Sequence, residues 1–244
     1  FDREALLGVS ITGWMNNPDI LFDAKILEEG ANIVRQVNRE VAEVIGINAA
    51  ARTTCVKPSG NASVLLQTAS GIHAEHSNMY IRNVQMNKES EVTQAIQKTN
   101  PHMVEESVWS AGGTDVVVSF PILPKEGSML KDELIGVDHL ELVKKAQEHW
   151  VNAGTNEELC ADKGIRHNVS NTIIVKDWDE VESYVFKNRR SFAGISFLSS
   201  MGDKDFNQAP NTGVIDANTM VDKYGTAAIF ASGLVVDALN AFDN

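Results

Sequence analysis

The chain has 244 residues, of which 43% are hydrophobic and 22% are charged, a balance typical of a globular protein and unlike that of a disordered or fibrous one. Its 33 acidic and 21 basic residues give a net charge of -12, which disfavours binding to polyanions such as duplex nucleic acid. The two cysteines, Cys55 and Cys160, are far apart and not in CxxC spacing, which disfavours a disulfide framework and a zinc site.

The ends of the chain bear on its location and its completeness. The first residues lack the basic-then-apolar order of a signal peptide, and no apolar run reaches about 18 residues. We therefore expect a cytoplasmic protein that does not enter the membrane. The sequence begins at Phe1, without Met, inside an amphipathic pattern, and its last predicted helix has no cap. This predicts a chain truncated at both ends.

A long helix and a short strand are the first clear predicted elements. Apolar side chains in residues 23–47 recur at three- and four-residue steps between charged ones, which predicts an amphipathic helix. The apolar positions are Ile26, Leu27, Ile33, Val34, Val37, Val41, Val44 and Ile45. Residues 52–56 are rich in β-branched side chains, which indicates a short buried strand. Pro58 and Gly60 interrupt that strand, and we expect a helix over residues 61–69.

Helices and strands alternate along the rest of the chain. The expected helices cover residues 90–100, 137–153 and 227–241, with another beginning at Asp177; the expected strands cover residues 115–120, 169–175 and 192–198; residues 209–213 are expected to be a loop. Pro121 is expected to end the strand before it, because proline cannot donate to a sheet. Asp177 and Glu180 have capping-box spacing. This alternation predicts an α/β fold built as one unit.

The turn between the strand at residues 52–56 and the helix that follows is the most informative segment for function. Its residues are Pro58, Ser59, Gly60, Asn61, Ala62 and Ser63. If Ser59 or Asn61 begins the helix, unpaired backbone N–H groups and the positive end of the helix dipole converge beside two serine hydroxyls. The turn is therefore a candidate seat for an anion such as phosphate.

Simpler interpretations of these residues stand beside that one. On physical grounds alone, serine and glycine at such a turn more often serve only to cap a helix. The turn is not a P-loop, because Lys57 precedes it and no Gly-Lys-Ser/Thr follows, which disfavours a nucleotide hydrolase. Cys55, in an apolar strand, is most simply a core residue. His73 and His76 lack a third ligand, so no metal site is predicted.

Several stretches of the chain carry a family resemblance. Residues 52–66, followed by Ala69-Ser70-Gly71-Ile72-His73, are similar to a signature of the adenosylcobalamin-dependent (class II) ribonucleotide reductases. Residues 8–15, 167–172 and 192–198 agree with that family in order and spacing. The matching stretches span residues 8 to 198, and the tail beyond about Gly213 is less diagnostic.

The resemblance implies a fold, a reaction and a role for the turn. The family's fold is a ten-stranded α/β barrel with a central finger loop, so residues 1–244 would be the C-terminal portion of the catalytic barrel domain. Its reaction replaces the ribose 2'-hydroxyl of a ribonucleotide by hydrogen. The loop that matches Pro58 to Ser63 holds the substrate's phosphates and so orients the ribose.

The resemblance also implies a cofactor and partners. Adenosylcobalamin generates a thiyl radical in this family, and the cysteines, glutamate and asparagine that surround the radical would precede Phe1. We therefore assign no catalytic residue within the chain and expect the isolated chain to be inactive. The implied partners are the ribonucleotide substrate, a thioredoxin-like dithiol reductant, and the N-terminal half of the barrel in the same or a separate chain.

Two other functions remain open on sequence grounds. The chain could be the non-catalytic nucleotide- or phosphate-binding half of a split reductase that needs a partner chain. A glycyl-radical enzyme on the related barrel is disfavoured, because no glycyl-radical motif lies near the C-terminus. The sequence does not distinguish a diphosphate from a triphosphate substrate.

Overall fold

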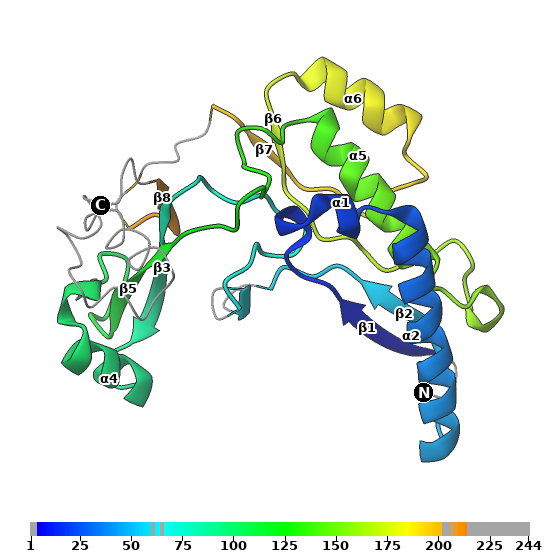
Figure 1. Cartoon of the computed structure of the whole chain (residues 1–244), viewed down its shortest axis with the longest axis horizontal. Coiled ribbons are helices and arrows are strands. Elements are labelled where there is room, and N and C mark those ends of the chain that lie inside the picture. The colour runs from blue at the N-terminus through cyan, green and yellow to red at the C-terminus, as the bar shows by residue number, and fades with distance from the viewer. Residues whose placement is uncertain (1–3, 60–61, 64–65, 202–205, 207, 214–244) are drawn as a thin grey trace. The chain divides into compact units, whose positions relative to one another are not determined.

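The computed structural model describes residues 4–59, 62–63, 66–201, 206 and 208–213. The chain divides into two compact units (Figure 1). Unit 1 comprises residues 1–75 and 126–202, and unit 2 comprises residues 76–125 and 203–244. No helix among the described residues combines the length and the apolar character needed to cross a membrane.

Unit 1 is built from parallel strands and helices. Its strands are β1 (Ala5–Ser10), β2 (Ala50–Cys55), β6 (Ile173–Val175) and β7 (Phe197–Ser199), and its α-helices are α1 (Pro18–Leu21), α2 (Ala24–Ile45), α5 (Val137–Ala146) and α6 (Trp178–Lys187). Strand β1 pairs with β2 and β6 pairs with β7, in both cases in parallel. A parallel bridge also joins Val56 to Val169. These parallel pairs, linked through helices, confirm the predicted α/β class.

The core of unit 1 lies where α2, α5 and the strands meet. Its largest fully buried side chains include Trp14, Met15, Leu27, Leu140 and Ile173. Helix α5 continues into a π-helical segment, η3 (Gln147–Asn152), so the predicted helix over residues 137–153 is present with a changed hydrogen-bond pattern. Short 3₁₀ segments η1 (Trp14–Asn16) and η4 (Glu157–Leu159) complete unit 1.

Helix α2 confirms the predicted amphipathic helix and its two ends. The Asp23 carboxylate accepts a hydrogen bond from Ile26 N at 2.9 Å, which caps the first turn. Gly46 ends the helix in the left-handed conformation, with φ +72°. Helix α6 begins in the same way, because Asp177 accepts from Glu180 N at 3.1 Å.

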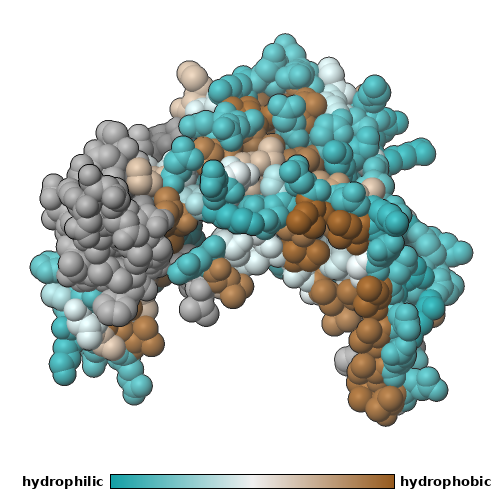
Figure 2. All heavy atoms as spheres, viewed as in Figure 1, coloured by the Kyte–Doolittle hydropathy of each residue, from teal (hydrophilic) through white to brown (hydrophobic). Residues whose placement is uncertain are grey.

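The apolar face of α2 is wider than the surface that the described core covers. Leu27 and Ala31 are buried, whereas Ile33 is 62% exposed and Val44 is 85% exposed. Figure 2 shows a brown strip along this helix, and the exposed hydrophobic residues of α2 include Ile33, Val37, Val41 and Val44. The periodicity therefore predicts the helix correctly but does not reveal which apolar positions are packed.

The described part of unit 2 is an antiparallel sheet with helix α4 (Glu91–Thr99). Its strands are β3 (Tyr80–Asn87), β4 (Val104–Glu106), β5 (Asp115–Ile122) and β8 (Asn211–Gly213), and they lie in the order β4-β5-β3-β8. Helix α4 (Glu91–Thr99) and the 3₁₀ segment η2 (Pro101–Met103) precede β4. The unit's buried cluster consists of Ile81, Met103, Val116 and Val118.

Unit 2 corrects two sequence predictions. Strand β5 continues through Pro121, which pairs with Ile81 of β3. On its other side, β5 pairs with β4 only as far as Val118. No described strand lies opposite Pro121 on that side, so the N–H that proline lacks is not needed for pairing there. Residues 211–213 form β8 instead of a loop, because they pair with β3. The helix predicted over residues 227–241 lies outside the described residues.

Candidate functional site

Strand β2 leads into the predicted phosphate-binding turn and is buried along its whole length. Its threonine hydroxyls donate to carbonyls of the segment around η3: Thr53 to Gly154 O at 2.8 Å and Thr54 to Trp150 O at 2.7 Å. Arg52 pairs with Glu4 at 2.6 Å. These polar side chains are paired where water is excluded, so they fix the strand that precedes the turn.

The hydroxyl of Thr12 connects both ends of the segment that contains the turn. It donates to Ala69 O at 2.9 Å, accepts from Gly71 N at 2.9 Å, and lies 2.7 Å from Ser59 Oγ. Because the single Thr12 hydroxyl hydrogen points to Ala69 O, Ser59 is the donor in the bond between the two hydroxyls. The Ser59 hydroxyl is therefore already used within the protein.

The helix expected over residues 61–69 is not formed to its predicted length. Ala62 and Ser63 are helical, but Leu66 lies in a turn and Gln67 has φ +51°. Ser59 N donates to Ser70 Oγ at 3.1 Å, and Ala62 N donates to Ser59 O at 2.9 Å.

These bonds change the physical basis of the predicted seat. Among its members, Pro58 is exposed, Ser59 is half-buried and Ser63 is buried, while Gly60 and Asn61 lie outside the described residues. The amides of Ser59 and Ala62 already have acceptors, and a long helix dipole does not stand behind the turn. Of the described amides of the turn, those of Ser59 and Ala62 are therefore not free to bind a phosphate.

Asn16 is an anchor for this region that sequence reasoning missed. Its Oδ1 accepts from Ala69 N and from Thr68 Oγ1, both at 2.6 Å, and its Nδ2 donates to Glu75 Oε1 and Ser128 Oγ, both at 2.8 Å. Its side chain uses all four amide hydrogen-bonding positions although the residue is only 7% exposed. The sequence signal that could have pointed to Asn16 is its position directly after residues 8–15, one of the stretches that resemble the family.

A cavity of about 360 Å³ lies beside the start of the turn. Its lining residues are Leu6, Leu7, Gly8, Cys55, Val56, Lys57, His167, Asn168 and Ser170. The predicted turn reaches this lining through Lys57, the residue immediately before Pro58. The cavity combines one cation with hydroxyl, amide and imidazole groups, so it can bind a polar organic anion.

The surroundings of the His167 imidazole favour its neutral form. Burial lowers its pKa, although a hydrogen bond to Thr54 O opposes this effect. His167 Nδ1 lies 3.1 Å from that carbonyl oxygen, which can only accept, so Nδ1 carries the proton. In the neutral ring Nε2 is then a hydrogen-bond acceptor.

The two cysteines, and the two histidines considered as metal ligands in the sequence analysis, lie in surroundings that suit a structural role. Cys55 and Cys160 are buried free thiols, and burial raises the pKa of each. His73 in unit 1 lies 2.9 Å from Ser70 O through Nδ1, and His76 in unit 2 packs beside Tyr80. The described residues bring together no group of three or more potential metal ligands from His, Cys, Asp and Glu.

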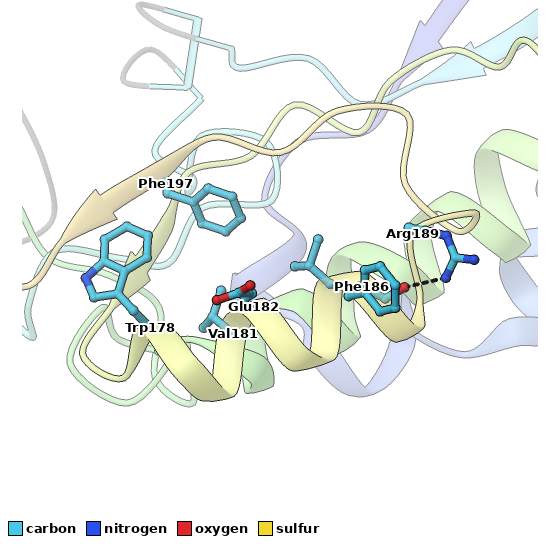
Figure 3. A pocket seen from close by; sticks show the side chains of 7 residues that line it. Trp178, Val181, Glu182, Phe186, Arg189 and Phe197 are labelled. Atoms are coloured by element: carbon cyan, nitrogen blue, oxygen red, sulfur yellow. Dashed lines mark hydrogen bonds between the residues drawn. The ribbon is translucent and has the colours of Figure 1, made fainter.

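A second cavity, of about 470 Å³, lies between α6 and β7 (Figure 3). Trp178, Phe186 and Phe197 contribute aromatic surface to it, with ionic groups from Glu182 and Arg189. The Arg189 guanidinium lies over the Phe186 ring, 4.8 Å from its centroid. Because this lining is mostly aromatic and apolar, it suits a phosphate less well than the cavity beside Lys57.

Comparisons with known proteins agree with the resemblance seen in the sequence. No protein-family model matches the chain. The chain is 25% identical over 163 residues to the adenosylcobalamin-dependent ribonucleoside-triphosphate reductase of Euglena gracilis, covering 66% of this chain and 22% of that protein. It is 27% identical over 131 residues to a Dictyostelium discoideum protein named "Probable adenosylcobalamin-dependent ribonucleoside-triphosphate reductase", covering 54% of this chain and 16% of that protein.

A solved structure has the same fold over most of this chain. The crystal structure of a B12-dependent (class II) ribonucleotide reductase matches with a TM-score of 0.63 and 19% sequence identity, covering 85% of this chain and 28% of that one. The chain therefore spans less than a third of each of these longer proteins. The predicted resemblance is confirmed: this chain is similar in sequence to adenosylcobalamin-dependent ribonucleotide reductases and has the fold of part of the class II enzyme.

Proposed function

We propose that this chain is part of an adenosylcobalamin-dependent ribonucleotide reductase and that it supplies the loop for the substrate's phosphates. The similarity over 66% of the chain to a protein named for that activity carries the proposal. In this view, the parallel strands of unit 1 are part of a ten-stranded barrel, and residues 1–244 are its C-terminal portion. The loop consists of Pro58, Ser59, Gly60, Asn61, Ala62 and Ser63.

The role of the loop is to position the ribose. Its Ser59 hydroxyl can exchange its present acceptor, Thr12, for a phosphate oxygen. A phosphate oxygen that accepts from the Ser59 hydroxyl would replace Thr12 as its acceptor. Thr12 Oγ1 would still accept from Gly71 N and donate to Ala69 O. Each bond lost is replaced by a charge-assisted bond, which is the stronger kind. Binding energy from the phosphates thus goes into orienting the sugar.

The two cysteines of this chain do not suit the radical chemistry of the cofactor, and we derive no step through it. When bound in such enzymes, adenosylcobalamin supplies the means to generate a thiyl radical. Cys55 and Cys160 are buried thiols with raised pKa values, so neither is assigned a part in that chemistry. We assign the radical chemistry, and most of the cofactor contacts, to residues outside this chain.

The remaining partners follow from the same proposal. The substrate is a ribonucleoside di- or triphosphate, and the names of both relatives favour the triphosphate. A thioredoxin-like dithiol protein would supply the reducing equivalents, and the N-terminal half of the barrel would supply the reacting cysteines. If that half is a separate chain, this one is the nucleotide-binding half of a split reductase.

Titration of the chain with a ribonucleoside triphosphate tests the phosphate seat. We expect Ser59→Asp to weaken binding at least tenfold, because it places a carboxylate where phosphate oxygens gather. Ser183→Asp on the exposed side of α6 adds the same charge at a distant position of unit 1 and should leave the affinity unchanged. Equal affinity of the wild type and Ser59→Asp would contradict the proposed seat.

A further inference from the structure

The backbone of Lys57 is fixed at the boundary between the cavity and the phosphate loop. Its N–H donates to Ser10 Oγ at 2.9 Å. Its carbonyl oxygen lies close to Gly71, where a Cβ would come within 2.7 Å of it. Gly71 has φ +56°, so glycine is needed there on both steric and conformational grounds. The direction in which Lys57 leaves β2 is therefore set before any ligand arrives.

The Lys57 ammonium is available to a ligand. Lys57 is exposed and lines the cavity. None of the residues that the structure describes accepts a hydrogen bond from it or forms an ion pair with it. The chain as a whole carries a net charge of -12, so an anion here needs a local cation to overcome that field. Lys57 supplies a full positive charge for binding an anion, which the short helical turn at Ala62 does not.

The segment that pairs with Val56 contributes hydrogen-bonding groups to the lining. Ser170 N donates to Val56 O at 2.9 Å, and Val56 N donates to Asn168 O at 3.2 Å, which fixes residues 168–170 beside the end of β2. His167, Asn168 and Ser170 line the same cavity, and burial favours the neutral form of the His167 ring because it lowers the pKa. One cation and several uncharged hydrogen-bonding groups match a ligand with a charged tail and a hydroxylated body.

We propose that this cavity holds the nucleoside end of a ribonucleoside polyphosphate, with Lys57 pairing with its phosphates and His167 Nε2 accepting a hydrogen bond from a ribose hydroxyl. The inference rests on the proposed function and adds residues to its site. Lys57 would contribute to binding of any polyphosphate, whereas His167 would contribute only when a ribose is present. The two contributions can therefore be separated by changing the ligand.

The experiment is a calorimetric titration of the chain with two probes, CTP and inorganic tripolyphosphate. Lys57→Met keeps the aliphatic stem and removes the charge. His167→Asn keeps an amide donor near the position of Nδ1, facing Thr54 O, and removes the Nε2 acceptor. Lys163→Met removes the same charge from an exposed position elsewhere in unit 1 and is the matched control. Circular dichroism checks that each variant is folded.

The expected pattern differs between the variants. The wild type should bind CTP more tightly than tripolyphosphate. Lys57→Met should weaken both ligands about tenfold or more, the effect of losing a charge-assisted hydrogen bond. His167→Asn should weaken CTP about fivefold, as expected for one neutral hydrogen bond, and leave tripolyphosphate unchanged. Lys163→Met should change neither affinity.

Three results would overturn the inference. If CTP and tripolyphosphate bind with equal affinity, and neither Lys57→Met nor His167→Asn changes it, the cavity does not bind the nucleotide. The proposed phosphate loop would not be contradicted by that result. An equal loss for both ligands in His167→Asn would show that the ring only supports the fold. Failure of the wild type to bind either probe would contradict the proposed phosphate seat and this inference together.

Discussion

Units 1 and 2 satisfy their buried polar groups by different means. In unit 2 the backbone groups of β3 and β5 pair along a continuous antiparallel register, from Tyr80 opposite Ile122 to Asn87 opposite Asp115. In unit 1 the paired stretches are short, and loop carbonyls and amides bond to buried side chains. Examples are Asn16 with Ala69 N, His139 with Ile72 O, Asn156 with Ala50 O and Asn171 with Gly194 O.

The difference follows from the way the strands are connected. In unit 1 the parallel neighbours β1 and β2 are joined by a long crossover over residues 11–49, and its loop backbone must find partners outside the sheet. In unit 1 those partners are side chains, so the positions of its loops depend on individual residues. The candidate site lies on such loops, and its geometry should therefore be more sensitive to single substitutions than the sheet of unit 2.

The largest effect is expected at Asn16. Asn16→Ala removes four hydrogen bonds and leaves the buried Ala69 N–H without its acceptor. We expect a loss of about 3 kcal/mol or more in the free energy of unfolding of unit 1. Urea unfolding followed by tryptophan fluorescence measures it, because Trp14 and Trp150 are buried in that unit.

Asn83→Ala in unit 2 is the matched comparison. Asn83 donates to Ala209 O at 2.6 Å and accepts from Ser119 Oγ at 2.8 Å. With two bonds lost and the β3–β5 register intact, we expect a cost of about 1 to 2 kcal/mol, measured by hydrogen exchange of the β3 amides. Equal costs for the two asparagines would contradict the contrast between the units.

The sequence predicts the fold best where local signals are strong. The Asp177 cap, the apolar periodicity of α2 and the β-branched run of β2 all specify their elements correctly. The sequence does not reveal that residues 126–202 pack with residues 1–75, because the two stretches are far apart along the chain. Local patterns contain no information about such long-range packing. For the same reason, residues 211–213 form a strand only because β3 is available to pair with them.

The candidate site was predicted in its position but not in its full membership. The resemblance and the turn chemistry both pointed to Pro58 through Ser63, and that assignment stays a prediction. Thr12, Asn16 and His167 come from segments distant in sequence, and only the folded chain brings them to the turn or to its cavity. The sequence also suggested a helix after the turn, whereas Thr12 and Asn16 hold residues 68–71 in a non-helical conformation.

His139 makes the stability of unit 1 dependent on pH. Burial is the main cause that lowers its pKa from 6.5 to about 4 in the folded state. Between these pH values the unfolded chain binds a proton that the folded chain does not, so stability falls as the pH falls from about 6.5 towards 4. The loss approaches about 3 kcal/mol at about 1.4 kcal/mol per pKa unit.

His139→Gln is the control for this pH dependence. The glutamine amide can reach Ile72 O as His139 Nε2 does at 3.0 Å, but it does not titrate. Urea unfolding at pH 7 and pH 4.5 should show a smaller difference for this variant than for the wild type. Some dependence will remain, because burial lowers the pKa of His167 in the same direction. An unchanged pH dependence in His139→Gln would exclude His139 as its source.

The smallest effect is expected at Gln208 in unit 2, whose hydrogen bonds are exposed. Gln208 Nε2 donates to Glu106 O at 2.7 Å and to Glu105 Oε1 at 3.2 Å, and its Oε1 accepts from Val108 N at 2.9 Å. Water can replace each of these partners, so Gln208→Ala should cost about 1 kcal/mol or less by hydrogen exchange of β4. Gln208→Glu should cost more than Gln208→Ala, because a carboxylate loses both donor bonds and faces Glu105. If Gln208→Ala costs as much as Asn16→Ala, burial does not decide the value of these bonds and the contrast between the units fails.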